Sequence, residues 1–495
     1  MKQCKIQLQP LGKELVANKN TPLIDVLHEY GVEFPCGGKG TCGKCKVKLL
    51  EGEIEKSEIH KQKLQQLNLG EEWRLACHSK CTGNITLEVD QFTHMILADE
   101  SEFDFVATEG YGIAVDLGTT TIVAQLVDLA AGRVIAAESS LNPQAKFGYD
   151  LISRIEAAMS GKAGEMTQLI REHIGQMIAS ILSVHPVELS KVVVVGNTVM
   201  QFIFSGNDLS PLSSYPFHSD DLGMKEFKPS ELGWDFSVNE KVFFYPSIGS
   251  FVGSDILAGI AATGLYKNEK LTALIDLGTN GEIVLGNKDK IVCASTAAGP
   301  AFEGATISKG MRAVSGAISS IKEVGGELNV AIIGNVAPKG ICGSALIDAV
   351  AIFRKNNLIG SFCEIISGEP SIIIAQPVEL TQKDFYEFQL AKAAIAAGLT
   401  ILAKALSANE KDIDEIYIAG GFGSYVNINH VVATGMIESV PEKIRQMGNT
   451  ALIGAKMFLF SNTNIVEDIL SKTVHVNLEG DNEFQDIYIQ KMALD

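Results

Sequence analysis

Several features that mark other classes of protein are scarce in this chain of 495 residues. It has 14 prolines, and its 41 basic residues are outnumbered by 59 acidic ones, without a basic block of the kind that binds a phosphate backbone. The most apolar stretch, 192–204, is interrupted well short of the ~18 apolar residues that cross a membrane. The first residues lack an export signal. We therefore expect a cytoplasmic protein with no nucleic-acid partner and no membrane span.

The commonest ATPase motif, G-x-x-x-x-G-K-[ST], is also absent. One match to the dinucleotide fingerprint, at 38–43, follows no long strand and opens no helix, so the match is accidental. What the chain does have is 46% hydrophobic residues and a length that suits about three or four domain-sized units. The sequence predicts a folded multidomain protein, and any nucleotide site must be of another kind.

Cysteines are concentrated near the start of the chain, where Cys36-x5-Cys42-x2-Cys45 is followed by Cys77. Four thiolates on a glycine-rich loop and a later strand end can hold two irons, because the glycines let backbone amides turn toward the cluster sulfurs. A zinc site is the alternative, since Cys42 with Cys45 and Cys77 with Cys81 also form two thiolate pairs. Zinc would leave Cys36 unexplained, and the role of Cys81 stays open.

The spacing and the Arg-Leu-Ala-Cys context of Cys77 resemble the 2Fe-2S ferredoxins of the plant and adrenal type. Five residues separate the first two cysteines, as in the adrenal and bacterial relatives, whereas the plant spacing has four. The resemblance implies a β-grasp fold and a 2Fe-2S cluster held by Cys36, Cys42, Cys45 and Cys77. Residues 4–89 fit it with strand, strand, helix, cysteine loop, strand, helix, strand, strand, and we expect Pro22 at the first position of the first helix.

Two similar segments, 111–128 and 272–287, each place Asp-Leu-Gly-Thr between two apolar runs, at Asp116 and at Asp276. A tight turn of Gly and Thr presents backbone amides and hydroxyls to phosphate oxygens, and the aspartate can hold Mg²⁺ directly or through water. One Asp-x-Gly is ordinary turn chemistry. Two copies favour two similar lobes that hold one polyphosphate between them.

These turns resemble the first and second phosphate motifs of the superfamily of actin, sugar kinases and heat-shock chaperones. The third motif, an apolar strand ending in Gly-Gly where the bare backbone admits an adenosine, is matched at 416–423. The resemblance implies a two-lobed, actin-like (ribonuclease H-like) ATPase. It assigns catalysis to Asp116, Asp276 and Glu282, and leaves the water-activating base open between Glu282 and Glu303. It assigns nucleotide binding to Gly118, Thr119, Thr120, Gly278, Thr279, Asn280, Gly420, Gly421 and Phe422.

We expect the chain to divide into a ferredoxin-like domain (1–90), a linker (91–110), ATPase lobe I (111–268) and ATPase lobe II (269–495). Small residues in 251–260 and 449–459 would let two helices cross near a hinge. Four further glycine-rich and polar blocks are expected either to line the cleft or to form surface turns, namely 142–154, 196–200, 297–318 and 339–348.

The combination of domains resembles the reductive activators of corrinoid-dependent methyltransferases over nearly the whole chain. The resemblance implies ATP-driven transfer of one electron from the 2Fe-2S cluster to a corrinoid protein whose cobalt has been oxidised from Co(I) to Co(II). It implies ATP and Mg²⁺ as cofactors, a low-potential ferredoxin or flavodoxin as electron donor, and leaves a homodimer open. Larger members carry an additional domain between the ferredoxin and the ATPase, for which 90–110 leaves no room.

Two other functions stay open on the sequence alone. A small-molecule kinase with a regulatory iron-sulfur domain would turn over ATP steadily only with an added acceptor. A nucleotide-sensing electron carrier would bind ATP without hydrolysing it. Fold cannot separate them, because this superfamily hosts several functions, but the ferredoxin domain favours the reductive activator.

Overall fold

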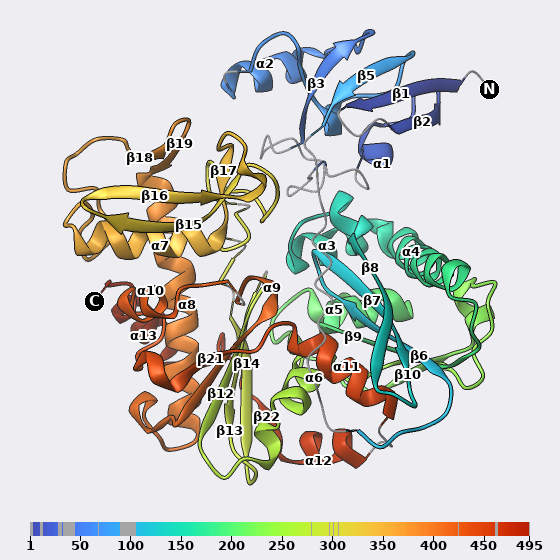
Figure 1. Ribbon diagram of the computed structural model, residues 1–495, viewed down its shortest axis with the longest axis vertical. Helices are drawn as coiled ribbons and strands as arrows, with labels where there is room; N and C mark the ends of the chain where they lie inside the picture. Colours follow the sequence, from blue (N-terminus) through green and yellow to red (C-terminus); the bar gives the residue numbers. More distant parts are fainter. Residues whose placement is uncertain are drawn as a thin grey trace.

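The computed structural model describes residues 3–9, 13–27, 32, 45–67, 69–89, 105–278, 280–296, 298–299, 301–304, 306–423, 425–460 and 464–494. These residues form an N-terminal module and two larger lobes (Figure 1). The module lies above the lobes in this view, lobe I is on the right and lobe II on the left, with two helices between them.

The N-terminal module is built on a five-stranded mixed sheet of order β2-β1-β5-β3-β4, in which β1 is antiparallel to β2 and parallel to β5. Cys4, Ile6 and Leu8 alternate with exposed residues along β1 and enter a core that belongs to the module alone. Its elements are β1 (Gln3–Gln9), β2 (Lys13–Asn18), α1 (Ile24–Leu27), β3 (Lys46–Glu51), α2 (Glu58–Gln66), β4 (Trp73–Leu75) and β5 (Ile85–Glu88). This order confirms the predicted sequence of strands and helices.

The first helix begins later than the sequence predicts. Pro22 does not occupy its first position but forms an isolated antiparallel bridge with Lys80. The next residue, Leu23, donates its N–H to Ser79 O at 2.9 Å, and α1 starts at Ile24. The prediction was wrong because a tertiary pairing with the segment after Cys77 engages Pro22 and Leu23 before the helix starts.

Lobe I is built on a six-stranded sheet of order β10-β11-β9-β6-β7-β8. Apolar residues of this sheet pack against three helices in one continuous core. The strands are β6 (Tyr111–Leu117), β7 (Thr121–Asp128), β8 (Arg133–Leu141), β9 (Leu189–Gly196), β10 (Lys225–Phe227) and β11 (Val242–Phe244). The helices are α3 (Leu151–Ala157), α4 (Ala163–Val184) and α5 (Thr198–Ser205).

Lobe II has a second six-stranded sheet, of order β21-β20-β12-β13-β14-β22. The strands are β12 (Thr272–Leu277), β13 (Gly281–Gly286), β14 (Ile291–Thr296), β20 (Glu415–Ala419), β21 (Ile444–Gln446) and β22 (Thr473–His475). Two smaller sheets contain β15 (Ala317–Val324), β16 (Glu327–Ile332), β17 (Gly340–Ile341), β18 (Ser371–Ala375) and β19 (Val378–Thr381). The helices are α7 (Gly343–Lys355), α8 (Gln382–Ala405), α9 (Gly420–Gly423), α10 (Ile428–Ala433), α12 (Asn464–Lys472) and α13 (Phe484–Gln490).

The two lobes contain the same strand unit. In lobe I, β6 is antiparallel to β7 and parallel to β9, and in lobe II, β12 is antiparallel to β13 and parallel to β20. The duplication predicted from 111–128 and 272–287 is therefore confirmed.

Helices α6 (Ser254–Thr263) and α11 (Thr450–Phe460) lie between the lobes and share a hydrophobic core with both sheets. They cross closely, because a Cβ at Gly454 would lie 2.1 Å from Ala258 O. The close crossing expected from the small residues of these helices is thus observed.

Among the described residues, α8 is long and apolar enough to cross a membrane by length and composition. However, 78% of its most apolar window is buried inside the protein, where its residues belong to the core of lobe II. Burial within the lobe accounts for its composition.

Candidate functional site

Two of the predicted cluster ligands lie together in the N-terminal module. Cys45 immediately precedes β3, and Cys77 lies in the short helix η2 (Ala76–His78) that follows β4. Their Sγ atoms are 3.2 Å apart. Cys36 and Cys42 lie outside the described residues. The placement of Cys45 and Cys77 fits two thiolates that bind one centre.

Cys81 lies apart from this pair. Its Sγ is 3.5 Å from Gly83 O, and its backbone O accepts from the Cys4 thiol at 3.6 Å. Burial, with a further contribution from Cys4, raises the pKa of Cys81 to about 12. Because Cys81 faces Cys4 rather than Cys77, the structure does not bring Cys77 and Cys81 together as the zinc alternative requires.

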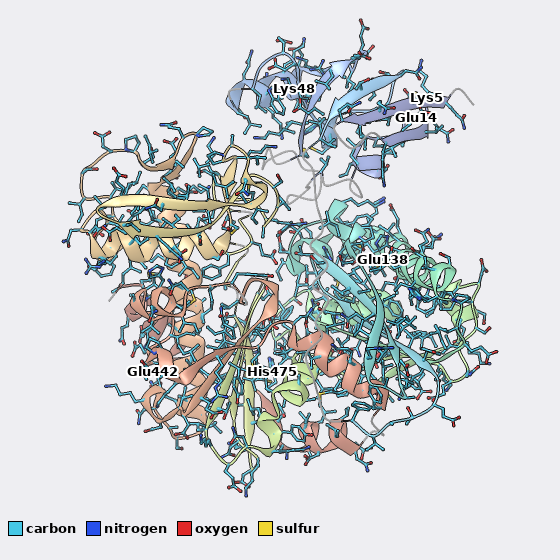
Figure 2. The ribbon with its side chains drawn as sticks, viewed as in Figure 1. Lys5, Glu14, Lys48, Glu138, Glu442 and His475 are labelled. Carbon is cyan, nitrogen blue, oxygen red and sulfur yellow. The ribbon has the colours of Figure 1, made fainter. Side chains whose placement is uncertain are left out.

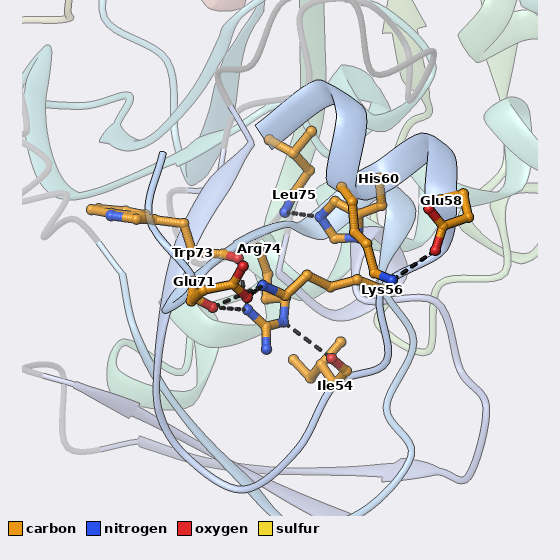
Figure 3. Close-up of polar contacts among 9 residues, drawn as sticks. Ile54, Lys56, Glu58, His60, Glu71, Trp73, Arg74 and Leu75 are labelled. Carbon is orange, nitrogen blue, oxygen red and sulfur yellow. Dashed lines mark hydrogen bonds and ion pairs between the residues drawn. The ribbon is translucent and has the colours of Figure 1, made fainter. Parts of the chain in front are cut away.

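Strand β4, which leads into the short helix of Cys77, is held by the buried guanidinium of Arg74 (Figure 3). The guanidinium donates to the carbonyl oxygens of Ile54 at 3.1 Å, Glu71 at 2.6 Å and Trp73 at 2.8 Å. These bonds explain physically why an arginine stands in the Arg-Leu-Ala-Cys context. They fix the end of β4 from which Cys77 follows.

Sequence reasoning missed His60, a buried residue of α2 that holds the same strand. Its Nε2 accepts the N–H of Leu75 at 2.9 Å (Figure 3). Burial lowers the pKa of His60 to about 4, so the ring is neutral and Nε2 can act as an acceptor. A histidine in a helix carries no sequence signal for this role, because its partner belongs to another element.

Each predicted phosphate turn closes an antiparallel hairpin. In the first, Gly118 N–H donates to Thr121 O at 3.1 Å, and in the second, Gly278 N–H donates to Asn280 O at 3.0 Å. Asp116 is the second-last residue of β6, and Asp276 occupies the equivalent position in β12. Thr279 lies outside the described residues. The structure thus places the two aspartates at matching strand ends of the two lobes.

All three carbonyls of the first turn are bound by the segment 142–154. Asn142 donates from Nδ2 to Gly118 O at 2.9 Å and from its backbone N–H to Thr120 O at 2.9 Å. The buried guanidinium of Arg154 donates to Thr119 O. This glycine-rich and polar block therefore supports the phosphate turn and is not a surface turn.

The block that begins at Gly196 supports the same turn from another side. Asn197, the N-cap of α5, donates from Nδ2 to Thr119 Oγ1 at 2.9 Å. A Cβ at Gly253 would lie 2.2 Å from Gly196 O, so the start of α6 also packs directly on this block. Asn197 supplies a hydrogen-bond donor to the turn, and the glycine at position 253 lets the start of α6 approach the backbone of Gly196 closely.

Four carboxyl groups from four elements interact electrostatically between the lobes: Asp116, Asp255, Asp276 and Glu282. Burial raises the pKa of Asp116 to about 6, where a hydrogen bond from Asn449 opposes the rise. Burial and the charge of Asp116 raise that of Asp276 to about 7, and burial and the charge of Asp276 raise that of Asp255 to about 8. Burial first, then Asp255 and Asp276, raise the pKa of Glu282 well above its ordinary value. Such mutually raised pKa values mark a site that favours a cation.

Asp255 is a residue that sequence reasoning missed. The segment 251–260 was notable for its small residues, whereas the structure places Asp255 in the first turn of α6 with its charge felt by Glu282. Glu282 also accepts from Ser295 Oγ at 3.4 Å. The sequence signal that could have identified Asp255 is its place in the first turn of a helix, two residues after Gly253.

Asn449 connects the lobes at this cluster. Its Nδ2 donates to Asp116 Oδ2 at 2.8 Å, and its Oδ1 accepts from Leu452 N at 2.9 Å within α11. Glu303 of lobe II makes a second connection, accepting from Thr120 Oγ1 at 3.2 Å. Both contacts reach the first phosphate turn from lobe II.

The third motif brings bare backbone against the second turn. Gly420 has φ 88°, and a Cβ there would lie 2.6 Å from Asp276 Oδ1 and 2.8 Å from Leu277 O. Gly421 and Phe422 continue from it as the backbone of α9. A side chain at position 420 is therefore excluded by both conformation and space.

Within the described part of the chain, no three His, Cys, Asp or Glu side chains are grouped closely enough to hold a metal ion by themselves. A cation at the four carboxylates must complete its shell with other oxygens. Mg²⁺ is normally bound in this way, by one or two carboxylates together with waters and phosphate oxygens. The residues present fit Mg²⁺ that arrives with a nucleotide.

Three family models match the chain. They are described as "2Fe-2S iron-sulfur cluster binding domain" over 6–82, "RACo middle region" over 111–268, and "C-terminal domain of RACo the ASKHA domain" over 270–495. They confirm the predicted joining of a 2Fe-2S ferredoxin fold to an actin-like, nucleotide-binding fold.

Relatives match most of the length of the chain. "Corrinoid activation enzyme RamQ" of Eubacterium limosum is 34% identical over 450 residues, which are 81% of this chain and 74% of the relative. "[Co(II) methylated amine-specific corrinoid protein] reductase" of Methanosarcina barkeri is 26% identical over 421 residues, 77% of each chain. A solved structure, "Reductive activator for corrinoid,iron-sulfur protein", is 28% identical with a TM-score of 0.70 and covers 99% of this chain and 98% of its own.

Proposed function

Because this chain belongs to the family of reductive activators of corrinoid proteins, we propose that it uses ATP to transfer one electron from its 2Fe-2S cluster to the inactive Co(II) form of a corrinoid protein in a methyltransferase system, regenerating Co(I). The observation that carries this function is the presence in one chain of paired cluster thiols and of two phosphate turns at matching strand ends of the two lobes. The kinase and carrier alternatives are set aside, since the relatives are named an activation enzyme and a reductase.

Residues 1–90 form the ferredoxin domain in this proposal, 91–110 the linker, 111–268 lobe I and 269–495 lobe II. Cys36, Cys42, Cys45 and Cys77 hold the cluster, an assignment that the adjacent sulfurs of Cys45 and Cys77 support. When bound, a plant-type cluster supplies one electron at a potential of roughly −400 mV. Arg74 and His60 hold the strand end at Cys77 and so orient this ligand.

The nucleotide assignment uses both turns. Asp116 and Asp276 bind Mg²⁺, which is supported by the raised pKa values that a cation would lower. Mg²⁺ supplies neutralisation of the phosphate charge when it is bound. The phosphates are held by Gly118, Thr119, Thr120, Gly278, Thr279 and Asn280, and the adenosine by Gly420, Gly421 and Phe422.

Three carboxyl groups are candidates for the base that takes a proton from water. Glu282 is one, and the structure adds Asp255, whose pKa of about 8 lies close to neutral pH, where a general base is most effective. Glu303 is the third candidate, and its carboxylate accepts from Thr120 Oγ1. Glu282 stays the catalytic carboxylate of this proposal, and burial together with the charge of Asp255 raises its pKa.

Closure of the two lobes around ATP provides the coupling to electron transfer. We propose that closure changes the contacts with the corrinoid protein, so that Co(II) loses an axial ligand or the cluster approaches the cobalt. A low-potential ferredoxin or flavodoxin re-reduces the cluster, and the chain works in the cytoplasm, alone or as a homodimer. Within the described residues the cysteines form no disulfide, which suits a reducing compartment.

The test is reduction of a Co(II) corrinoid protein by the full chain with its cluster, followed by the cobalt absorption spectrum under anaerobic conditions with and without ATP. Asp116→Asn should abolish the ATP-dependent reduction and leave the cluster spectrum intact. Asp289→Asn, in the exposed hairpin between β13 and β14, is the matched control. Unchanged reduction by Asp116→Asn would contradict the site, and no ATP-dependent reduction by the unaltered chain would contradict the function.

A further inference from the structure

An ion pair joins the N-terminal module to lobe I. Lys146 Nζ lies 3.6 Å from Asp25 Oδ1 of the module and 3.0 Å from Glu165 Oε1 of α4. The Lys146 side chain is only 12% exposed, whereas those of Asp25 and Glu165 are 43% and 46% exposed. The lysine is therefore packed into the contact, and its ammonium interacts both with the N-terminal module and with lobe I.

Lys146 is the last residue of a short helix, η3 (Pro143–Lys146), that starts at the first phosphate turn. Asn142, the N-cap of η3, accepts from Gln144 N at 3.0 Å while it binds Gly118 O and Thr120 O. Gln144 Nε2 donates to Met166 O at 3.0 Å, which fixes the helix on α4. One short helix thus reaches from the carbonyls of the phosphate turn to the module.

We propose that Lys146 is a positioning residue through which the first phosphate turn sets the position of the ferredoxin module against lobe I. When phosphates enter the turn and its backbone adjusts, Asn142 must follow, because it binds two of the turn's carbonyls. A movement of helix η3 then changes the distance between the ammonium of Lys146 and the carboxylate of Asp25. Asp25 lies in α1, which precedes the cysteine loop in the chain.

This coupling rests on the proposed function and deepens it, because it gives the nucleotide a physical means to place the electron donor. Coupling between two sites is reciprocal, so docking of the module must change nucleotide affinity by the same factor as nucleotide changes docking. A partly exposed ion pair can carry a change of about two- to fivefold.

The experiment compares four single variants of the full chain with its cluster. Asp25→Asn breaks the contact with the module and leaves the Lys146–Glu165 pair, whereas Lys146→Gln breaks both. Lys162→Gln is a matched control, because Lys162 binds Glu165 at 3.1 Å. Glu14→Gln is a control inside the module, where Glu14 pairs with Lys5 at 2.8 Å across β1 and β2 (Figure 2).

Two readouts need no corrinoid protein. One is hydrogen–deuterium exchange of the peptide 21–27 with and without a non-hydrolysable ATP analogue, and the other is the affinity for that analogue. We expect the analogue to change the exchange of 21–27 in the unaltered chain and both controls. Asp25→Asn and Lys146→Gln should lose this change and shift the affinity by about two- to fivefold.

The double variant Asp25→Asn/Lys146→Gln should add nothing to the single ones. A full nucleotide response in Asp25→Asn, or additive effects in the double variant, would overturn the proposal. Failure of the unaltered chain to reduce Co(II) would instead concern the proposed function, because the exchange and affinity measurements do not depend on it.

Discussion

The two phosphate turns share Asp-Leu-Gly-Thr and the same hairpin geometry, yet their surroundings differ. The carbonyls of the first turn are bound by 142–154, and its Asp116 accepts from Asn449 of lobe II. The second turn lies against the bare backbone at Gly420. A duplicated sequence thus gives one local structure, while the neighbours of each copy give it a different role. The first turn connects through 142–154 to the ferredoxin module, whereas the second lies against the Gly-Gly motif that we propose holds the adenosine.

The largest expected effect comes from Arg154 of α3, whose guanidinium supports the first turn. Burial lowers its pKa to about 9, with the charge of Asp150 opposing, and its guanidinium donates to Thr119 O and Gly148 O. Arg154→Leu leaves both buried carbonyls without this donor, so we expect the free energy of unfolding to fall by about 3 kcal/mol. Urea denaturation measures the change.

Arg154→Lys keeps the charge but not the planar fork, and should lose part of the same stability. Arg133→Leu, at an exposed position of β8, is the control and should stay near the unaltered chain. If Arg154→Leu unfolds at the same urea concentration as Arg133→Leu, the support of the first turn is not what stabilises lobe I.

The next effect concerns the second turn. Gly420→Ala places a Cβ 2.6 Å from Asp276 Oδ1 at a residue with φ 88°. We expect the affinity for an ATP analogue to fall by about ten- to a hundredfold, from strain of a few kcal/mol at this position. Gly164→Ala in α4 is the control, because no atom lies within 4 Å of the added Cβ. Equal affinities of the two variants would show that Gly420 does not form the nucleotide site.

Both turns and the Gly-Gly motif could be predicted because their information is local. Asp-x-Gly-Thr between two apolar runs encodes a hairpin, and bare backbone after a strand encodes close approach. The same holds for the cysteine spacing and for the order of elements in the module. These features need only neighbours in the chain.

The partners of the site could not be predicted, because tertiary structure brings them together. Asn449 is 333 positions from Asp116, and no spacing rule links an amide at the start of α11 to a carboxylate at the end of β6. Asp255 and His60 are also single polar residues whose roles depend on a distant strand. The error at Pro22 has the same cause, since a local capping rule lost to pairing with Lys80.

The stability of the chain should depend on pH through the carboxyl groups that lie between the two lobes. The unfolded carboxyl groups ionise near pH 4, whereas the pKa values of Asp276 and Asp255 are raised to about 7 and 8 in the fold. The native state then binds more protons than the unfolded state, so the contribution of these groups to stability falls as pH rises from about 4 to 8. Thermal denaturation of the nucleotide-free chain across this range measures the fall.

Binding of Mg²⁺ and nucleotide favours the charged carboxylates and should therefore strengthen with pH, by up to about tenfold per pH unit for each proton released. Asp276→Asn should flatten both dependences, because it removes one titrating group and one of the charges that, after burial, raise the pKa of Asp255. A dependence that survives in this variant would assign the protons to other groups.

The smallest expected effect tests why the two aspartates differ. Asn449 donates to Asp116 at 2.8 Å and lowers its pKa, while its Oδ1 accepts from Leu452 N–H. Asn449→Ser keeps a side-chain acceptor for that N–H but removes the amide donor. The pKa of Asp116 should then rise toward that of Asp276, moving the pH midpoint of Mg²⁺–nucleotide binding upward and weakening binding at neutral pH by about threefold. Isothermal titration at several pH values measures the midpoint; if it does not move, the hydrogen bond from lobe II is not what distinguishes the first turn from the second.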